Sequence, residues 1–410
     1  MTRFRLGINY WPRRSAMYMW QRFDAGEIRD DMAQIAALGL DCVRFFLTWE
    51  DFQPERARID AAALTNLRIT MDAIGDAGLA AIPTLFTGHM SGVNWLPEWT
   101  LDAHTPHGRF RTYSRGRELP FGIGDFYRQP LLDAQLFQAE AVASALKGHP
   151  ALWLWDLGNE FSNLREPQTP ADAAQWSAAL TAVLSENSAA GVTGGTHGED
   201  LTRDRHIRPS SICAPWTFAT MHGYSVYFPQ SRGRLDDEVV PFLCRLMQSC
   251  AQQPVFFSEF GNPTCPPGTV SPYDRVPLPG ETTTQQNAPP RNAAAFACLT
   301  EEEMCRYGYA VLDHLQRCGA LGAMWWCYAD YADELRDLPP FDRAPHELSF
   351  GIVRADGSQK PIARTLQQFA AENRATMPVP SALVDEAAYY SGLPATLVDA
   401  YSKYCEPVSQ

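Results

Sequence analysis

The chain has 410 residues, of which 45% are hydrophobic and 20% charged, and its formal net charge at pH 7 is −13. This hydrophobic fraction is sufficient for a folded core, so the composition excludes a disordered chain. The acidic balance argues against nucleic-acid binding, because a polyanion requires a basic surface. No apolar run approaches membrane-spanning length, and no secretory leader is visible at the N-terminus. We therefore expect a cytoplasmic protein without nucleic-acid or membrane partners.

The ten cysteines are scattered along the chain, without the short paired spacings of a zinc site. Several lie in apolar runs, where a free cysteine behaves as a small hydrophobic residue. We expect these cysteines to be reduced, in keeping with a cytoplasmic location.

Short apolar segments alternate with amphipathic helical segments along most of the chain. Because a helical segment follows most of the strands, the strands are expected to pair in parallel within a covered sheet. Eight such units predict an α/β protein with a (β/α)8 TIM barrel, a fold that commonly takes about 250 residues. The expected strands are 4–10, 42–48, 80–86, 152–157, 191–195, 218–222, 255–259 and 320–326, and the expected helices are 28–38, 64–77, 134–146, 171–188, 239–252 and 301–318.

The residues in excess of a minimal barrel fall in long loops. Loops 88–133, 261–300 and 328–360 follow the third, seventh and eighth expected strands. All three would lie at the C-terminal face of the barrel, where active sites of this fold are built. We assign residues 1–376 to a catalytic barrel. Residues 377–410 are expected to form a C-terminal extension that packs on the barrel or lies at a homo-oligomer contact.

Two of the expected strands run into a glutamate. The segments Leu-Trp-Asp-Leu-Gly-Asn-Glu and Val-Phe-Phe-Ser-Glu-Phe-Gly place Glu160 and Glu259 at the outlet ends of buried strands. Burying a carboxylate costs free energy unless it is paired or used. Three strand–helix units separate the two residues, so their carboxylates can converge over the barrel axis. Paired carboxylates of this kind carry out glycoside hydrolysis.

Other residues at the expected strand ends extend this pattern. From residue 4 to about residue 370, the chain resembles glycoside hydrolase family 5 and the wider clan A of retaining (β/α)8 glycosidases. The matching positions are Arg44 in Val-Arg-Phe-Phe-Leu-Thr-Trp, His89 in Thr-Gly-His-Met-Ser-Gly, Asn159 and Glu160, His222 and Tyr224 in Met-His-Gly-Tyr, Glu259 in Ser-Glu-Phe-Gly, and Trp326.

The resemblance implies that Glu160 is the catalytic acid/base and Glu259 the catalytic nucleophile, and it implies no cofactor. We expect Arg44 and the Tyr224 hydroxyl to keep Glu259 ionised. The negative charge of Glu259 is then expected to raise the pKa of Glu160, so that Glu160 stays protonated as the acid.

Tryptophans are candidates for sugar platforms, because pyranose CH faces stack on aromatic rings. Trp49, Trp95 and Trp99 follow expected strands. Trp325 and Trp326 are adjacent, and because side chains alternate along a strand only one of them can point inward; we favour Trp326. The expected substrate-binding set is Arg44, His89, Asn159, His222, Tyr224, Trp326 and Trp95.

Two further patterns carry weaker signals. His104 and His107 have a looser spacing than a zinc-binding helix motif, so we expect no metal site there. The glycine-rich segment 191–198 lacks the lysine of a phosphate-binding loop and is interpreted as the fifth strand and its turn. From that turn Glu199 and Asp200 could reach the cleft.

Three observations favour a mannoside as the substrate and its chain end as the site of attack. The absence of a visible leader indicates small imported oligosaccharides. The long loops could wall off a groove into a pocket, and segments 88–95 and 347–361 resemble intracellular, mannoside-active members of family 5. We predict a retaining exo-β-mannosidase of short β-1,4-mannosides, including mannosyl-N-acetylglucosamine. Alternatives are an endo-β-1,4-mannanase or β-glucanase, a non-catalytic sugar-binding barrel and a metal-dependent barrel hydrolase.

Overall fold

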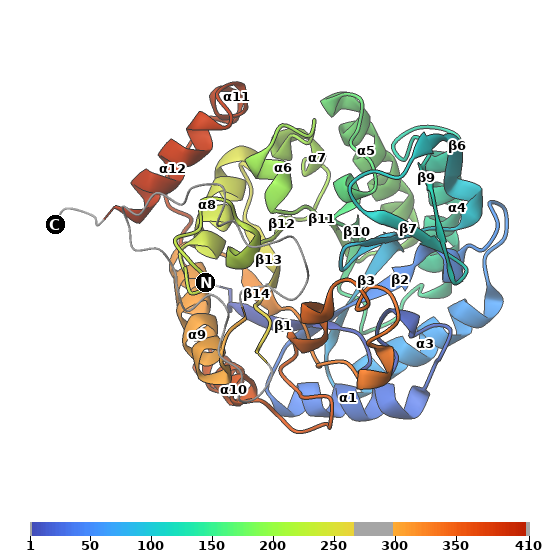
Figure 1. Cartoon of the computed structure of the whole chain (residues 1–410), viewed down its shortest axis with the longest axis horizontal. Helices are drawn as coiled ribbons and strands as arrows, with labels where there is room; N and C mark the ends of the chain where they lie inside the picture. Colours follow the sequence, from blue (N-terminus) through green and yellow to red (C-terminus); the bar gives the residue numbers. More distant parts are fainter. Residues whose placement is uncertain (1, 266–297, 407–410) are drawn as a thin grey trace.

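A computed structural model describes residues 2–265 and 298–406 of the chain (Figure 1). Within them, eight parallel strands form one sheet in the order β11-β10-β3-β2-β1-β14-β13-β12. The two outer strands meet, since Thr217 N donates to Val192 O at 2.8 Å. This closure gives the predicted (β/α)8 barrel. The strands are β1 Arg5–Tyr10, β2 Cys42–Thr48, β3 Ala80–Thr87, β10 Leu154–Asn159, β11 Gly191–Gly195, β12 Ala219–His222, β13 Val255–Phe260 and β14 Gly322–Trp325.

Helices surround the strands (Figure 1). Several begin with local sequence signals, as in α5 and α9, where Thr169 and Thr300 each form a capping box. All expected strands and helices are present, with ends within three residues of the prediction. The helices are α1 Ala25–Ala37, α2 Trp49–Phe52, α3 Ala61–Asp76, α4 Leu131–Ala145, α5 Pro170–Asn187, α6 Gly198–Thr202, α7 Pro209–Ile212, α8 Val239–Ala251, α9 Glu301–Arg317, α10 Pro361–Ala371, α11 Glu386–Ser391 and α12 Ala395–Cys405.

The inside of the barrel is filled by side chains at the end opposite the long loops. Gly7 of β1 faces this plug, and a Cβ there would lie 2.6 Å from Cys42 Sγ and 2.7 Å from Met324 Cε. Because this end of the barrel is packed with side chains, a ligand site is expected at the C-terminal ends of the strands. The plug consists of Cys42, Ile82, Leu154, Phe218, Phe256 and Met324.

The long loop after β3 has its own secondary structure. Its strands form one small sheet in the order β4-β5-β7-β8 and a separate pair of β6 with β9. The expectation of a loop over 88–133 is therefore refined to a set of short strands. They are β4 His89–Met90, β5 Val93–Trp95, β6 Leu101–Pro106, β7 Arg111–Ser114, β8 Arg117–Leu119 and β9 Phe121–Ile123.

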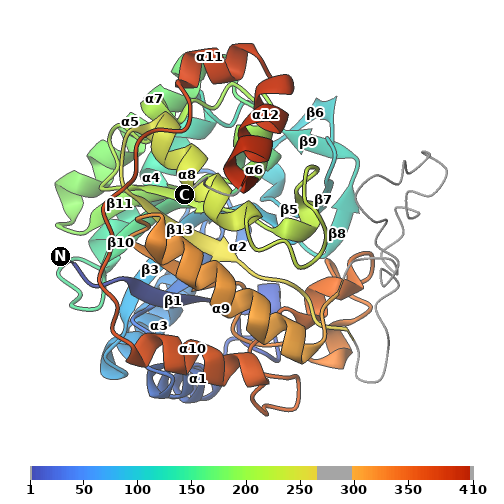
Figure 2. The same cartoon turned by 90° about the vertical axis from the view of Figure 1, so that its left-hand side faces the viewer.

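The C-terminal helices α11 and α12 lie beside α6 and α8 (Figure 2). The Tyr389 hydroxyl donates to Leu201 O at 2.8 Å, and the Tyr390 hydroxyl donates to Asp200 O at 2.7 Å. Both acceptors belong to α6, which follows β11 at the C-terminal face. The extension therefore supports a segment that borders the barrel mouth.

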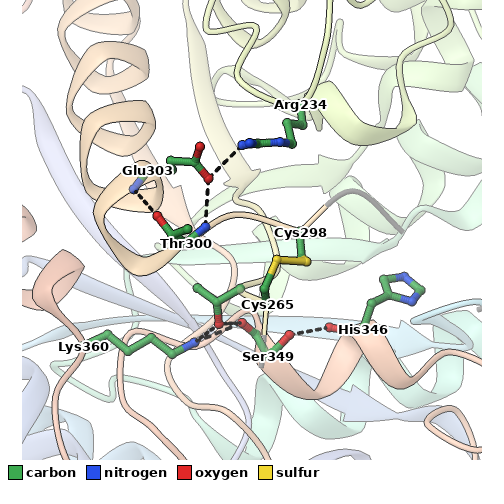
Figure 3. Close-up of a disulfide and its surroundings, with 9 residues drawn as sticks. Arg234, Cys265, Cys298, Thr300, Glu303, His346, Ser349 and Lys360 are labelled. Carbon is green, nitrogen blue, oxygen red and sulfur yellow. Dashed lines mark hydrogen bonds and ion pairs between the residues drawn. A yellow bond between two sulfur atoms is a disulfide. The ribbon is translucent and has the colours of Figure 1, made fainter. Parts of the chain in front are cut away.

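Cys265 and Cys298 form a disulfide (Figure 3). This corrects the expectation that every cysteine is reduced. The two residues are 33 positions apart and lack a short paired spacing, so sequence gave no signal for the bond. Most of the expected loop 261–300 lies outside the described residues. In the described part of the chain, no helix is both long and apolar enough to cross a membrane.

Candidate active site

A cavity of about 540 Å3 opens at the C-terminal ends of the strands. Both glutamates singled out by sequence line it, and so do residues that follow β3, β11, β12 and β14. The structure thus brings together side chains from most of the barrel. The lining residues that carry the argument below are His89, Asn159, Glu160, His197, Glu199, His222, Tyr224, Tyr227, Glu259, Trp326 and Glu347.

Glu160 and Glu259 face one another across this cavity. Glu160 follows β10 in a left-handed conformation with a φ of 44°, and its N–H donates to Gly195 O at 2.9 Å. Glu259 lies within β13. One carboxylate oxygen of each glutamate lies within 4.8 Å of the other. Retaining glycosidases hold their carboxyl groups about 5–5.5 Å apart and inverting enzymes about 6.5–9.5 Å apart, so this separation fits retention.

Glu259 is held from two sides. Arg44 Nη1 donates to its Oε2 at 3.0 Å, and the Tyr224 hydroxyl donates to its Oε1. Arg44 also donates from Nε to Asp156 Oδ2 at 2.7 Å and from Nη2 to Asn159 Oδ1 at 2.9 Å. With 1% of its side chain exposed, Arg44 lies beneath the cavity and does not line it. The contact with Glu259 is the one expected from the sequence, whereas a contact of Arg44 with the substrate stays a prediction.

Glu160 is surrounded by imidazoles. His222 Nδ1 lies 3.3 Å from its Oε1, while His89 Nε2 and His197 Nδ1 lie 3.8 and 3.9 Å from its Oε2. Asn163 Nδ2 also donates to this Oε2 at 3.0 Å. Burial raises the pKa of Glu160, but the imidazoles, His197 most strongly, outweigh burial and lower it. This is the reverse of the expected direction, because the sequence analysis did not foresee the cluster of imidazoles.

His197 was missed by sequence reasoning, which interpreted segment 191–198 only as a strand and turn. Arg205 Nη1 donates to His197 Nε2 at 3.1 Å. Because a guanidinium can only donate, Nε2 acts as the acceptor and the ring proton is on Nδ1, on the side of Glu160. The signal for this residue was its position two residues after the fifth strand.

His222 Nδ1 contacts both carboxylates, at 3.3 Å for Glu160 and 3.5 Å for Glu259. These three residues could also offer one ligand atom each to a metal ion, since the atoms lie within 4.8 Å of one another. However, the guanidinium of Arg44 already supplies a positive charge at Glu259 and would repel a cation there.

Of the two adjacent tryptophans after the eighth strand, Trp326 lines the cavity. Trp325 is fully buried and donates from Nε1 to Phe350 O at 3.0 Å. This is the arrangement that strand alternation favoured. His89 and Asn159 also line the cavity, and Asn159 Nδ2 donates to His89 O at 3.0 Å.

The other candidate sugar platforms do not line the cavity. Trp95 is 2% exposed, and its ring packs against Tyr113 at 5.2 Å because β5 pairs with β7. Trp49 and Trp99 pack against each other at 5.7 Å. The small sheet after β3 covers the Trp95 side chain, so its predicted contact with substrate has no support from the lining of this cavity.

Two further carboxylates belong to the cavity wall. Glu199 lines it and pairs with Arg205 at 3.2 Å, whereas Asp200 is buried beside Ser162. Glu347, which sequence treated only as part of a family-like segment, also lines the cavity. Burial raises the pKa of Glu347 to about 7.

No family model matches the chain, and no curated protein sequence matches it. Solved structures do match. A glutamate-to-alanine variant of GH5_18 from Streptomyces cattleya, in complex with Manβ1-4GlcNAc, aligns with a TM-score of 0.76 and 21% identity over 98% of this chain and 90% of that chain. The chain therefore shares the (β/α)8 fold of this solved structure.

Two other solved structures also match the chain. A glutamate-to-alanine variant of GH5_18 from Bifidobacterium longum subsp. longum, also in complex with Manβ1-4GlcNAc, aligns with a TM-score of 0.71 and 21% identity over 92% of this chain and 80% of that chain. An exo-β-1,4-mannosidase from Opitutaceae bacterium strain TAV5 aligns with a TM-score of 0.68 and 26% identity over 90% of this chain and 60% of that chain. The resemblance to family 5 found in the sequence is thus confirmed at the level of fold.

Proposed function

We propose that the protein is a retaining exo-β-mannosidase that hydrolyses short β-1,4-linked mannosides, including mannosyl-N-acetylglucosamine. The observation that carries the proposal is the approach of Glu160 and Glu259 to within 4.8 Å in one cavity. A pair of carboxyl groups at this separation fits a double displacement.

In the first step, a carboxylate oxygen of Glu259 attacks the anomeric carbon and forms a glycosyl–enzyme ester. The bond to the leaving oxygen breaks, and that oxygen takes a proton from Glu160. The hydrogen bonds from Arg44 and Tyr224 suit this assignment, because they keep Glu259 ionised and fix its orientation. In the second step Glu160 takes a proton from water, the water oxygen attacks the anomeric carbon, and the bond to Glu259 breaks.

Glu160 must carry a proton when the leaving group departs. The neighbouring imidazoles lower its pKa. A sugar that covers Glu160 removes water from its 17% exposed side chain, and such desolvation raises the pKa of a carboxyl group. Substrate binding is therefore part of how the acid is formed.

The choice of substrate is supported by the structural neighbours. Two GH5_18 structures hold Manβ1-4GlcNAc, and a third neighbour is an exo-β-1,4-mannosidase. A cavity of about 540 Å3 has room for a disaccharide rather than for a long polymer, which favours attack at a chain end. No cofactor is part of the proposed reaction.

The test is a comparison of Glu259→Ala with Glu199→Ala, which removes another carboxylate from the same cavity. Glu259→Ala is expected to lose turnover of an aryl β-mannoside, and azide should restore it by forming an α-mannosyl azide. Glu199→Ala should keep turnover without azide. Turnover by Glu259→Ala in the absence of azide would refute the assignment of the nucleophile.

Substrate and stereochemistry are tested on the wild-type protein. Mannobiose, mannosyl-N-acetylglucosamine and polymeric mannan are compared, and the first-formed anomer is followed by NMR. We expect release of β-mannose from the two disaccharides. An α-anomer would exclude double displacement, mixed-length products from mannan would support the endo-mannanase, and loss of activity with a chelator would support a metal-dependent hydrolase.

A further inference from the structure

Glu347 is a third carboxylate of the active-site cavity and has no role in the double displacement. It follows β14 in the short turn Pro345–Ser349 and is 8% exposed. Glu160 and Glu259 already supply the acid/base and the nucleophile. The presence of another acidic group in the same cavity therefore requires a separate explanation.

Glu347 joins two loops that are distant along the barrel. Ser91, after β3, donates to its Oε2 at 2.9 Å, and Tyr227, after β12, donates to its Oε1 at 3.3 Å. Around the closed barrel, β3 and β12 are separated by β2, β1, β14 and β13 on one side and by β10 and β11 on the other. The Ser91–Glu347–Tyr227 bridge thus closes the cavity on the side of β14.

This bridge lies on the side of the nucleophile. The ring of Tyr227 packs against that of Tyr224 at 5.4 Å, and Tyr224 donates its hydroxyl to Glu259. The sugar that becomes bonded to Glu259 must occupy this side of the cavity. The leaving group lies toward Glu160, whose other neighbours, His197 and Asn163, belong to a different part of the wall.

The partners of Glu347 leave it able to accept more hydrogen bonds. Among the described residues, no arginine or lysine forms an ion pair with it. The imidazole of His346 is 3.5 Å away, but burial lowers the pKa of His346 to about 4, so this ring is neutral at neutral pH. A carboxylate has about four lone-pair positions, and two hydroxyls engage only part of them. Vicinal hydroxyls of a sugar would fill the rest.

We propose that Glu347 is a specificity-determining residue that accepts hydrogen bonds from hydroxyl groups of the terminal mannose at the closed end of the cavity. The inference rests on the proposed function, because that function places a mannose on the side of the cavity where Glu259 lies. The carboxylate recognises the end of the chain, because a further sugar at these hydroxyls would meet the Ser91–Glu347–Tyr227 bridge.

The test measures kcat/KM for Glu347→Gln and wild type on an aryl β-mannoside and on its analogues that each lack one ring hydroxyl. A hydrogen bond to a charged group typically contributes about 10- to 100-fold. We expect Glu347→Gln to lose about that factor on the complete mannoside. On the one or two analogues that lack the contacted hydroxyl, the kcat/KM of wild type should fall by the same factor. On these analogues Glu347→Gln should have the same kcat/KM as wild type.

Two variants serve as controls. Glu50→Gln removes a carboxylate outside the cavity, one that accepts a hydrogen bond from Arg115 N at 2.8 Å. This variant should have the same kcat/KM as wild type on the mannoside and on each analogue. Ser91→Ala keeps Glu347 but removes one of its hydrogen-bond donors. Its kcat/KM should fall less than that of Glu347→Gln, and the fall should again disappear on analogues that lack the contacted hydroxyl. Thermal melting of each variant verifies that it is folded.

The outcomes separate the two proposals. If wild type hydrolyses the mannoside but Glu347→Gln loses the same factor on every analogue, Glu347 is only a structural bridge and the inference is wrong. If wild type hydrolyses no β-mannoside, the proposed function fails and the inference fails with it.

Discussion

The guanidinium of Arg44 lies 3.0 Å from the carboxylate of Glu259, and both side chains are almost completely buried. The same guanidinium also donates to Asp156 and Asn159. A buried ion pair adds little net stability, but removal of one partner leaves the other charge uncompensated. The contact is therefore best explained by its effect on the orientation of Glu259.

Replacement of Arg44 by methionine tests this relationship. The variant leaves Glu259 and Asp156 without their cation, so we expect the free energy of unfolding to fall by about 3–5 kcal/mol. Displacement of the nucleophile is expected to reduce kcat by about 100-fold. Arg44→Lys keeps the charge but not the planar fork, and should give intermediate values. Urea denaturation and turnover of an aryl β-mannoside measure the two effects; a folded Arg44→Met with wild-type kcat would contradict this role.

His197 is expected to control the pH range of activity. Of the imidazoles around Glu160, that of His197 lowers its pKa most strongly. His197→Gln removes this ring, so the pKa of Glu160 is expected to rise. Because the reaction needs protonated Glu160, the alkaline limb of kcat/KM should move to higher pH. The pH profile of an aryl β-mannoside measures this shift, with His206→Gln, which removes a histidine outside the cavity, as the control. A limb that stays in place would exclude His197 from this role.

The strands and the two glutamates could be predicted from the sequence because each is marked by residues that are close together in the chain. Apolar runs such as Val255–Phe260 are buried at every position, and Glu259 stands out within one of them. Contacts that depend on loops were not accessible in this way. Glu347 meets Ser91 and Tyr227 only after the chain has closed into a barrel, and Trp95 is covered by strands that pair locally. Similarly, no spacing indicated that Cys265 pairs with Cys298.

The stability of the protein should depend on Glu347 and pH. The pKa of Glu347 is raised to about 7 in the folded state, from an ordinary value of 4.5. Its contribution to stability is therefore fully present below about pH 4.5 and is lost as pH rises through about 7. Glu347→Gln stays neutral, so we expect it to exceed wild type in free energy of unfolding at pH 8, by up to about 3 kcal/mol. The difference should vanish near pH 4.5.

Glu199→Gln provides the opposite case. Burial raises the pKa of Glu199, but the hydrogen bond and charge of Arg109 outweigh burial and lower it. Its ionised form thus stabilises the fold above its ordinary pKa, and the variant should be less stable than wild type at pH 8. Chemical denaturation at several pH values measures both variants. If Glu347→Gln and wild type have equal free energies of unfolding at pH 8, the ionised carboxylate of Glu347 does not destabilise the fold.

The C-terminal extension is expected to stabilise the barrel. Tyr389, Tyr390 and Tyr401 are buried, and the Tyr401 hydroxyl donates to Asp236 Oδ2 at 2.6 Å. A chain that ends at residue 376 loses these buried rings, so its free energy of unfolding should fall on the order of 5 kcal/mol. Thermal melting measures the loss. Sedimentation of both forms tests the alternative that the extension lies at an oligomer contact, in which case truncation would change the molecular mass of the assembly.

The disulfide gives a prediction about the redox state of the protein. All ten cysteines lie among the described residues, and eight of them are free. Thiol titration of the denatured protein should therefore find eight groups before reduction and ten after it. Closing a loop of this length removes chain entropy from the unfolded state, so Cys265→Ser with Cys298→Ser should lose about 2–4 kcal/mol of stability. Cys305→Ser, at a free cysteine, should have little effect. Ten thiols in protein purified without reductant would show that the pair is reduced, as a cytoplasmic location predicts.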